Sequence, residues 1–125
     1  MVIELFDENE YRETIFRDGI TVVGIASKGT RLWRYLEMLL RKLESHFDSS
    51  TKVAIADVNV IKNMLQEFET KVAKQRTIIK VFANGTCIFM QEDVTENVAN
   101  DIEMLRRGIK DSLRRYSINV RLTVK

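Results

Sequence analysis

Residues 77–90 read TIIKVFANGTCIFM, and this stretch decides the fold. Two runs rich in β-branched and aromatic residues, 77–82 and 87–90, stand on either side of Asn84 and Gly85. Both central residues of the tight turn between two antiparallel strands need a positive φ, which asparagine and glycine tolerate best. The stretch therefore predicts a β-hairpin.

Before the hairpin, runs typical of strands alternate with stretches typical of helices. Residues 20–26 are β-branched and almost wholly apolar, as in a central strand that is buried on both faces. After Thr30, which can cap a helix, leucines recur at three- and four-residue steps and predict a long helix with one buried face. Asp7 can cap an earlier helix. The expected strands are 2–6, 20–26, 52–57, 77–82 and 87–90, and the other expected helices are about 8–17, 60–73 and 94–113. In the 60–73 helix, the expected buried face consists of Ile61, Met64, Leu65, Phe68 and Val72.

The residues after the hairpin predict the last helix and one more strand. Asp93 and Glu96 have the spacing of a capping box, so the helix is expected to begin near residue 94. Residues 116–125 then alternate between apolar and polar side chains, which is typical of a strand with one solvated face. Such a strand has to pair with a sheet edge, either in its own chain or in a second copy, and the second case predicts a homodimer. The candidate dimer strand presents Tyr116, Ile118, Val120, Leu122 and Val124 on its apolar side.

The composition limits the classes of function. The chain has 125 residues, of which 45% are hydrophobic and 30% charged, and this suits a single globular domain over residues 1–125. One cysteine, Cys87, and one histidine, His46, exclude an internal disulfide, a cysteine zinc cluster and a multi-histidine metal site. No apolar run has the length of a membrane span, and the N-terminus lacks the basic region of a secretory signal. We therefore expect a cytoplasmic protein with no membrane contact, no metal and no cofactor.

The order of elements, β-α-β-α-β-α-β-β-α followed by an extra strand, resembles the thioredoxin fold, an α/β fold with a mixed sheet. Residues 22–27 (VVGIAS) resemble the strand that leads into that family's active-site turn. Residues 53–59 (VAIADVN) resemble its third strand, which commonly ends in an Asp-x-Asp-like string. Residues 78–85 (IIKVFANG) resemble its terminal hairpin. The resemblance covers roughly residues 1–113, so the C-terminal strand is an addition to it.

The chain departs from this family where the family's chemistry lies. In the family a Cys-x-x-Cys opens the second helix, and a low-pKa thiolate at the helix N-terminus attacks a disulfide. Matching the strand and the helix places residues 29–32 (GTRL) on those four positions. The acid that the family often buries in the preceding strand falls on Val23, and its cis-proline falls on Arg76 or Thr77 in a chain without proline. The resemblance therefore implies a non-catalytic member that does not exchange disulfides.

Four single residues could have a functional role, but each also has a structural explanation. Cys87 lies in an expected strand, where it should pack as a small apolar residue. His46 follows a helix and is expected at the surface or as a cap. Asp57 ends a strand, where α/β proteins place functional acids, yet it can equally cap the next helix. Trp33 is expected to be partly in the core; if exposed beside arginines, it would suit contacts with proteins or unpaired bases.

Two functions follow as hypotheses. The first is a protein-interaction or self-assembly module, with an anion-friendly rim around the N-terminus of the second helix. The candidate rim consists of Ser27, Lys28, Gly29, Thr30, Arg31, Trp33, Arg34, Arg76 and Thr77. The alternative is a nucleic-acid-associated protein that uses residues 28–42, with five bases and one acid, and a second basic patch over 106–115. The candidate patch consists of Arg106, Arg107, Arg114 and Arg115.

Overall fold

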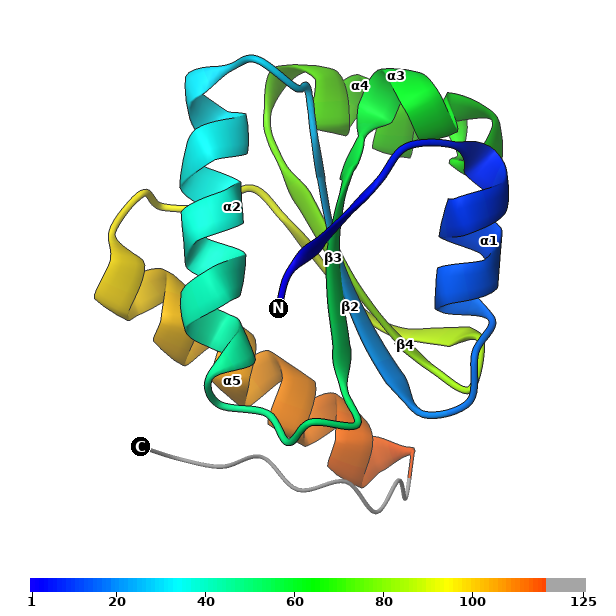
Figure 1. Cartoon of the computed structure of the whole chain (residues 1–125). Helices are drawn as coiled ribbons and strands as arrows, with labels where there is room; N and C mark the ends of the chain where they lie inside the picture. The colour runs from blue at the N-terminus through cyan, green and yellow to red at the C-terminus, as the bar shows by residue number, and fades with distance from the viewer. Residues whose placement is uncertain (117–125) are drawn as a thin grey trace.

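A five-stranded mixed sheet runs through the middle of the protein, whose computed structural model describes residues 1–116 (Figure 1). The strands are β1 (Ile3–Leu5), β2 (Ile20–Ala26), β3 (Lys52–Asp57), β4 (Ile78–Ala83) and β5 (Thr86–Glu92). Their order in the sheet is β1-β3-β2-β4-β5. β1 and β2 both pair with β3 in parallel, whereas β4 runs antiparallel to β2 and β5 antiparallel to β4.

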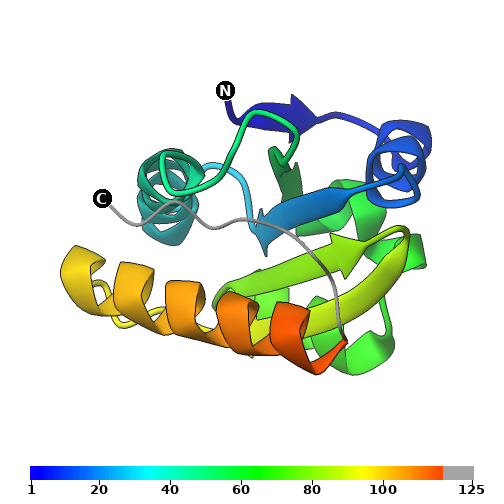
Figure 2. The ribbon, with the colours of Figure 1, turned by 90° about the horizontal axis from the view of Figure 1, so that it is seen from below.

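Two layers of helices cover this sheet. α2 (Arg31–Glu44) and α5 (Val98–Arg115) pack on one face. α1 (Glu8–Ile15), α3 (Val58–Ile61) and α4 (Glu67–Gln75) pack on the other face, as Figures 1 and 2 show. A short 3₁₀ turn, η1 (Lys62–Met64), follows α3. The α/β architecture that the sequence predicts is therefore confirmed, with one hydrophobic core on each side of the sheet.

Strand alternation explains how one apolar strand serves both cores. Val22 and Ala26 of β2 belong to the core under α2 and α5, whereas Val23 and Ile25 belong to the core under α1 and α4. All seven residues of β2 are buried, as expected of a central strand with both faces covered. Gly24 lies on the α2 side, where a Cβ would come within 2.6 Å of a methyl group of α2. The missing side chain therefore lets α2 approach the sheet closely.

Three of the predicted helix caps and the hairpin turn are confirmed. The carboxylates of Asp7 and Asp57 cap α1 and α3 by accepting backbone N–H bonds at 2.8 and 3.1 Å. The hydroxyl of Thr30 caps α2 in the same way at 3.2 Å. Asn84 and Gly85 form the turn of the hairpin with φ angles of 50° and 86°. These are the positive values that the Asn-Gly pair predicts.

The predicted helix over 60–73 is wrong, because the chain breaks within it. Leu65 and Gln66 are extended, with ψ angles of 152° and 158°, and separate η1 from α4. The carboxylate of Glu69 accepts the backbone N–H of Gln66 at 3.0 Å, which starts α4 as a new helix. Of the expected buried face, Ile61 is buried, and Met64, Leu65 and Val72 are partly buried against the core. Phe68, also expected in the core, is 47% exposed.

The predicted capping box before the last helix is also wrong. Asp93 and Glu96 have φ angles of 70° and 64°, which excludes both from a right-handed helix. Asn97 caps α5 instead, by accepting the N–H of Asn100 at 3.1 Å. The helix therefore begins four residues later than the expected residue 94, and it ends at Arg115.

The predicted C-terminal strand is not part of the described fold. Tyr116, its first residue, is the exposed C-cap of α5, with its N–H bonded to the last turn of the helix. The remaining members of the candidate dimer strand, Ile118, Val120, Leu122 and Val124, lie outside the described residues.

A β-bulge in β5 decides the environment of Cys87. Phe82 pairs with Cys87 and Val81 with Phe89, so Ile88 is the extra residue. Ile88 and Phe89 both pack toward α5, while Cys87 is exposed on β5. The expectation that Cys87 packs as a small apolar residue is therefore wrong, because the residue is exposed on this edge strand.

Candidate functional site

Three loops meet at one end of the sheet. Ala26 pairs with Asp57, and Ile78 pairs with both Ile25 and Glu92. The last residues of β2, β3 and β5 and the first residue of β4 therefore lie at the same end of the sheet. We call this region the three-loop end, defined as residues 27–31 after β2, 76–77 before β4 and 93–97 after β5.

Polar contacts tie these loops to one another. Arg31, at the start of α2, forms an ion pair with Glu96 in the loop after β5. Arg76 lies 3.6 Å from the carboxylate of Asp93, and the N–H of Asp93 donates to the carbonyl of Thr77 at 2.7 Å. The two ion pairs are solvent-exposed, so each contributes only about 0–1 kcal/mol. They show which residues of the loops are neighbours, but they contribute little to holding the loops in place.

A buried carboxylate holds the loop after β5 more firmly. Asp101, in the first turns of α5, is 0% exposed. It accepts from the backbone N–H of Thr95 at 2.9 Å, from the Thr95 hydroxyl at 2.8 Å and from the N–H of Glu96 at 3.1 Å. The hydroxyl of Tyr35 on α2 also donates to Asp101, at 2.5 Å. Desolvation and this hydrogen bond raise the pKa of Tyr35 well above its ordinary value, so the phenol remains a donor.

The loop after β2 is shaped by Thr30 and Lys28. The Thr30 hydroxyl accepts the N–H of Trp33 and donates to the carbonyl of Ser27 at 2.7 Å. Lys28 forms an ion pair with Glu4 of β1. Its ammonium lies 5.4 Å from the ring centre of Phe6 and 6.0 Å from that of Trp33, within the range of cation–π contacts.

The structure brings most of the predicted rim together, but it leaves fewer of the rim side chains accessible to a partner than the sequence predicts. Trp33 and Thr77 are buried, at 5% and 0% exposed, so neither side chain can contact a partner. Trp33 points into the core because it shares the sheet-facing side of α2 with Leu36 and Leu40. The remaining rim residues are exposed or half-buried: Ser27, Lys28, Gly29, Thr30, Arg31, Arg34 and Arg76.

The rim is less cationic than the sequence predicts. Lys28, Arg31 and Arg76 each contact a carboxylate, from Glu4, Glu96 and Asp93 respectively. Glu4 comes from β1, and Glu96 and Asp93 come from the loop after β5, so all three acids are distant in sequence from the cations and no local sequence pattern predicts these pairs. Asp101, which organises the same end, is also absent from the sequence-based candidates, because an acid in the first turn of a helix is an ordinary feature.

Comparison with solved structures gives the fold. Thioredoxin from Trypanosoma brucei brucei is similar to the chain with a TM-score of 0.66 and 16% identity, covering 91% of this chain and 92% of that one. Mitochondrial thioredoxin 3 from Saccharomyces cerevisiae has a TM-score of 0.63 and 18% identity, covering 88% and 94%. The chain has the thioredoxin fold. A structure from work on thiol resolution in a yeast mitochondrial 1-Cys peroxiredoxin is similar at a TM-score of 0.66 and 17% identity, covering 88% and 94%. No protein-family model and no curated protein matches the sequence.

The thiol of this thioredoxin-fold chain lies far from the three-loop end. Cys87 pairs with Phe82 next to the hairpin turn, whereas Glu92 at the other end of β5 pairs with Ile78. Along β4 their partners Phe82 and Ile78 are four residues apart, because the bulge adds one residue to β5, so the two ends lie roughly 13 Å apart. Partial burial of the Cys87 thiol raises its pKa, and Lys80 nearby lowers it by less. The thiol therefore lacks the helix N-terminus that generates a reactive thiolate.

The thioredoxin fold also brings the two predicted basic segments onto one face. α2 carries Arg34, Arg41 and Lys42, and α5 carries Arg106, Arg107, Arg114 and Arg115, while both helices pack against the same core. Glu37 lies 3.7 Å from Arg41, and Glu103 bonds both Arg106 and Arg107 at 2.8 and 2.7 Å. Acids on the same helices thus offset part of the charge.

Among residues 1–116, no group of three or more His, Cys, Asp or Glu side chains could hold a metal ion. No helix in that range combines the length and apolarity that crossing a bilayer requires.

Proposed function

We propose that this chain is a thioredoxin-fold protein that binds a partner protein or a second copy of itself and does not exchange disulfides. The observation that carries the proposal is the three-loop end. The exposed ion pairs of Arg31 with Glu96 and of Arg76 with Asp93 link its three loops, and Asp101 holds the loop after β5, yet residues 29–32 contain no thiol. The only thiol, Cys87, lies at the other end of β5 and has a raised pKa. A cytoplasmic location is part of the same proposal.

The three-loop end has the composition of a recognition surface. Phe6 is 63% exposed beside Lys28, whose ion pair with Glu4 places both signs of charge near the ring. Interfaces combine an aromatic anchor with a polar rim in this way. We therefore place the partner-binding surface at Phe6, Lys28 and the exposed residues of the three-loop end.

Insulin reduction tests the catalytic part of the proposal. In the presence of dithiothreitol, we expect the wild-type protein to reduce insulin no faster than the Cys87→Ala variant, because a thiol far from the α2 N-terminus cannot provide the reactive pair. The variant is a matched control for non-enzymatic thiol chemistry. Turnover by the wild type well above that of the variant would contradict the proposal.

Light scattering tests self-association. β5 is a seven-residue edge strand, so its outer backbone groups are open to a further strand among the described residues. We expect the full chain to be a dimer and residues 1–115 to be a monomer, because the predicted strand would pair across two copies. A monomeric full-length protein at tens of micromolar would contradict the homodimer. If the truncated protein aggregates, a full-length point variant such as Val120→Lys should be compared with the wild type in its place.

The second candidate function is nucleic-acid binding, and the observation that favours it is the shared face of α2 and α5. Binding through phosphates releases counterions, so affinity should fall steeply with salt. If this function holds, an oligonucleotide should bind the wild type at low salt and lose its binding as the salt rises to the physiological concentration. The double substitution Arg114→Gln and Arg115→Gln should make the affinity fall less steeply with salt. The absence of binding at low salt would leave only the protein-interaction function.

A further inference from the structure

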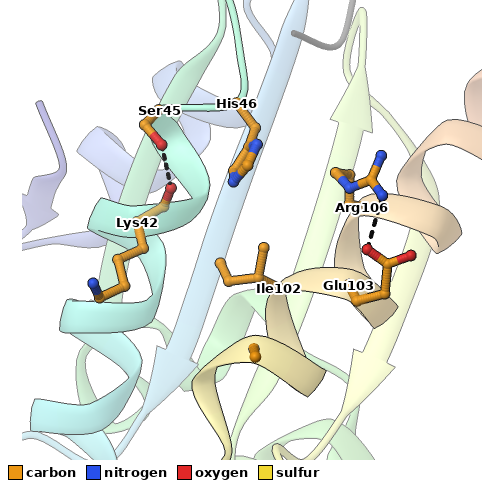
Figure 3. A pocket seen from close by; sticks show the side chains of 7 residues that line it. Lys42, Ser45, His46, Ile102, Glu103 and Arg106 are labelled. Carbon is orange, nitrogen blue, oxygen red and sulfur yellow. Dashed lines mark hydrogen bonds and ion pairs between the residues drawn. The ribbon is translucent and has the colours of Figure 1, made fainter. Parts of the chain in front are cut away.

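A cleft of about 410 Å³ lies between the C-terminal end of α2 and the N-terminal half of α5 (Figure 3). It is separate from the residues that define the three-loop end, and it falls in the size range of small-molecule sites. From the α2 side it is lined by Lys42, Ser45 and His46, and from α5 by Ala99, Ile102, Glu103 and Arg106. The cleft is therefore built by two helices that a common core holds in place.

His46 contributes its imidazole ring to the lining of this cleft. Its backbone N–H donates to Leu43 at 2.9 Å, which fixes the turn after α2. The ring is half-buried, and its Nδ1 is buried without a hydrogen-bond partner among the described residues. That nitrogen has no surface open to the cleft, so a ligand would meet the exposed part of the half-buried ring. In Figure 3 the imidazole lies between the side chains of Lys42 and Arg106, above Ile102.

The charges of the cleft favour an anion. Lys42 is exposed and has no carboxylate within ion-pair distance in residues 1–116. Glu103 is the acid of the cleft, but it already accepts from Arg106 at 2.8 Å and from Arg107 at 2.7 Å. These two hydrogen bonds lower the pKa of Glu103, so its side chain is a carboxylate. The positive charges of Arg106 and Arg107 offset its negative charge. The bond to Glu103 uses one guanidinium nitrogen of Arg106 and orients the rest of the group.

We propose that this cleft binds a small organic phosphate through Lys42, His46 and Arg106. A phosphate monoester has three terminal oxygens, which match donors from three side chains, and Lys and Arg both bind phosphate well. Ala99 and Ile102 supply an apolar floor for the organic part of the ligand. The proposal is independent of the partner-binding function, and neither outcome determines the other.

A chemical-shift titration of the full chain with phenyl phosphate tests this site. We expect saturable shifts for the amides of residues 42–46 and 102–106 and weaker binding of inorganic phosphate, which cannot use the apolar floor. Arg106→Gln should weaken binding about tenfold, since it removes a charge-assisted hydrogen bond. Arg107→Gln is the matched control, because Arg107 bonds the same Glu103 without lining the cleft. It should change the affinity by less than a factor of about two.

Two further variants keep the test decisive. Lys42 is exposed, so Lys42→Gln cannot unfold the chain and should weaken binding even if Arg106→Gln disturbs α5. His46→Gln should also weaken binding. Shifts that do not saturate at millimolar phenyl phosphate, or an equal loss in Arg106→Gln and Arg107→Gln, would overturn the site. A phosphoserine peptide that binds more tightly than phenyl phosphate would overturn the assignment to a small ligand.

Discussion

Replacing Asp101 with alanine is expected to lower the free energy of unfolding by about 3 kcal/mol. The carboxylate is 0% exposed and accepts four hydrogen bonds, from Tyr35, from Glu96 and twice from Thr95. The loop donors can turn toward water in the variant, whereas the hydroxyl of half-buried Tyr35 is left at a helix interface. The loss is therefore smaller than the sum of four charged hydrogen bonds. Thermal unfolding should detect it as a fall of roughly 10 °C.

The matched control for this variant is Asp111→Ala on the same helix. Asp111 is exposed, so its removal should change stability by less than about 0.5 kcal/mol. Asp101→Asn should be intermediate, because an amide oxygen still accepts from the loop. Amide shifts in the Asp101→Ala variant should change most at residues 93–97, which would assign the loss to the three-loop end. Equal stability of the Asp101 and Asp111 alanine variants would contradict the observed network.

Local chemistry explains why much of the fold can be predicted from the sequence. Asn84 and Gly85 specify their own turn, and Asp7, Thr30 and Asp57 specify helix starts, since each acts on a backbone group within three residues. The apolar run of β2 likewise predicts burial on both faces from its own residues alone. These features need no knowledge of distant parts of the chain, and the structure confirms them.

The errors arise where two local signals compete. Residues 60–73 have a helical apolar pattern, but Gln66 and Glu69 also have the spacing of a helix start. The structure follows the second signal, and Phe68 leaves the core. Before α5, the capping-box spacing of Asp93 and Glu96 competes with Asn97 as the signal for where the helix starts. The Asn97 cap agrees better with the hydrogen bonds that the loop donates to Asp101.

The candidate site could be located from the sequence but not described in detail. The resemblance to the thioredoxin fold predicts that residues 27–34 and 76–77 meet, and the sheet register brings their loops together. The partners of the rim cations come from other elements, as Glu4 and Glu96 do, and the contact of Tyr35 with Asp101 spans 66 positions. Such pairs depend on the packed structure. Cys87 is a further case, because it is exposed beside a bulge that depends on how β4 and β5 pair.

The second large effect concerns Gly24, where alanine is expected to destabilise the fold by about 2 kcal/mol. In a strand, glycine is ordinarily less stable than alanine by about 0.5–1 kcal/mol, so without a steric conflict the substitution would stabilise the protein. Here an added Cβ would lie 2.6 Å from Cδ1 of Leu40 and 3.0 Å from Cδ2 of Leu36. Both leucines are fully buried and cannot move outward. The sign of the change, measured by urea unfolding, therefore reports how closely α2 packs on β2.

A double-mutant cycle with Leu40→Ala separates this conflict from other effects on the strand. Leu40→Ala alone should cost about 2–5 kcal/mol, because it removes buried methyl groups and leaves a cavity. That cavity accepts the Cβ of Gly24→Ala, so the double variant should be more stable than the sum of the single effects by about 1 kcal/mol or more. Additive effects would mean that the new methyl group meets something other than Leu40. A Gly24→Ala variant that unfolds at or above the urea concentration of the wild type would contradict the close approach of α2 to the central strand, and with it the geometry that carries Thr30 and Arg31 to the three-loop end.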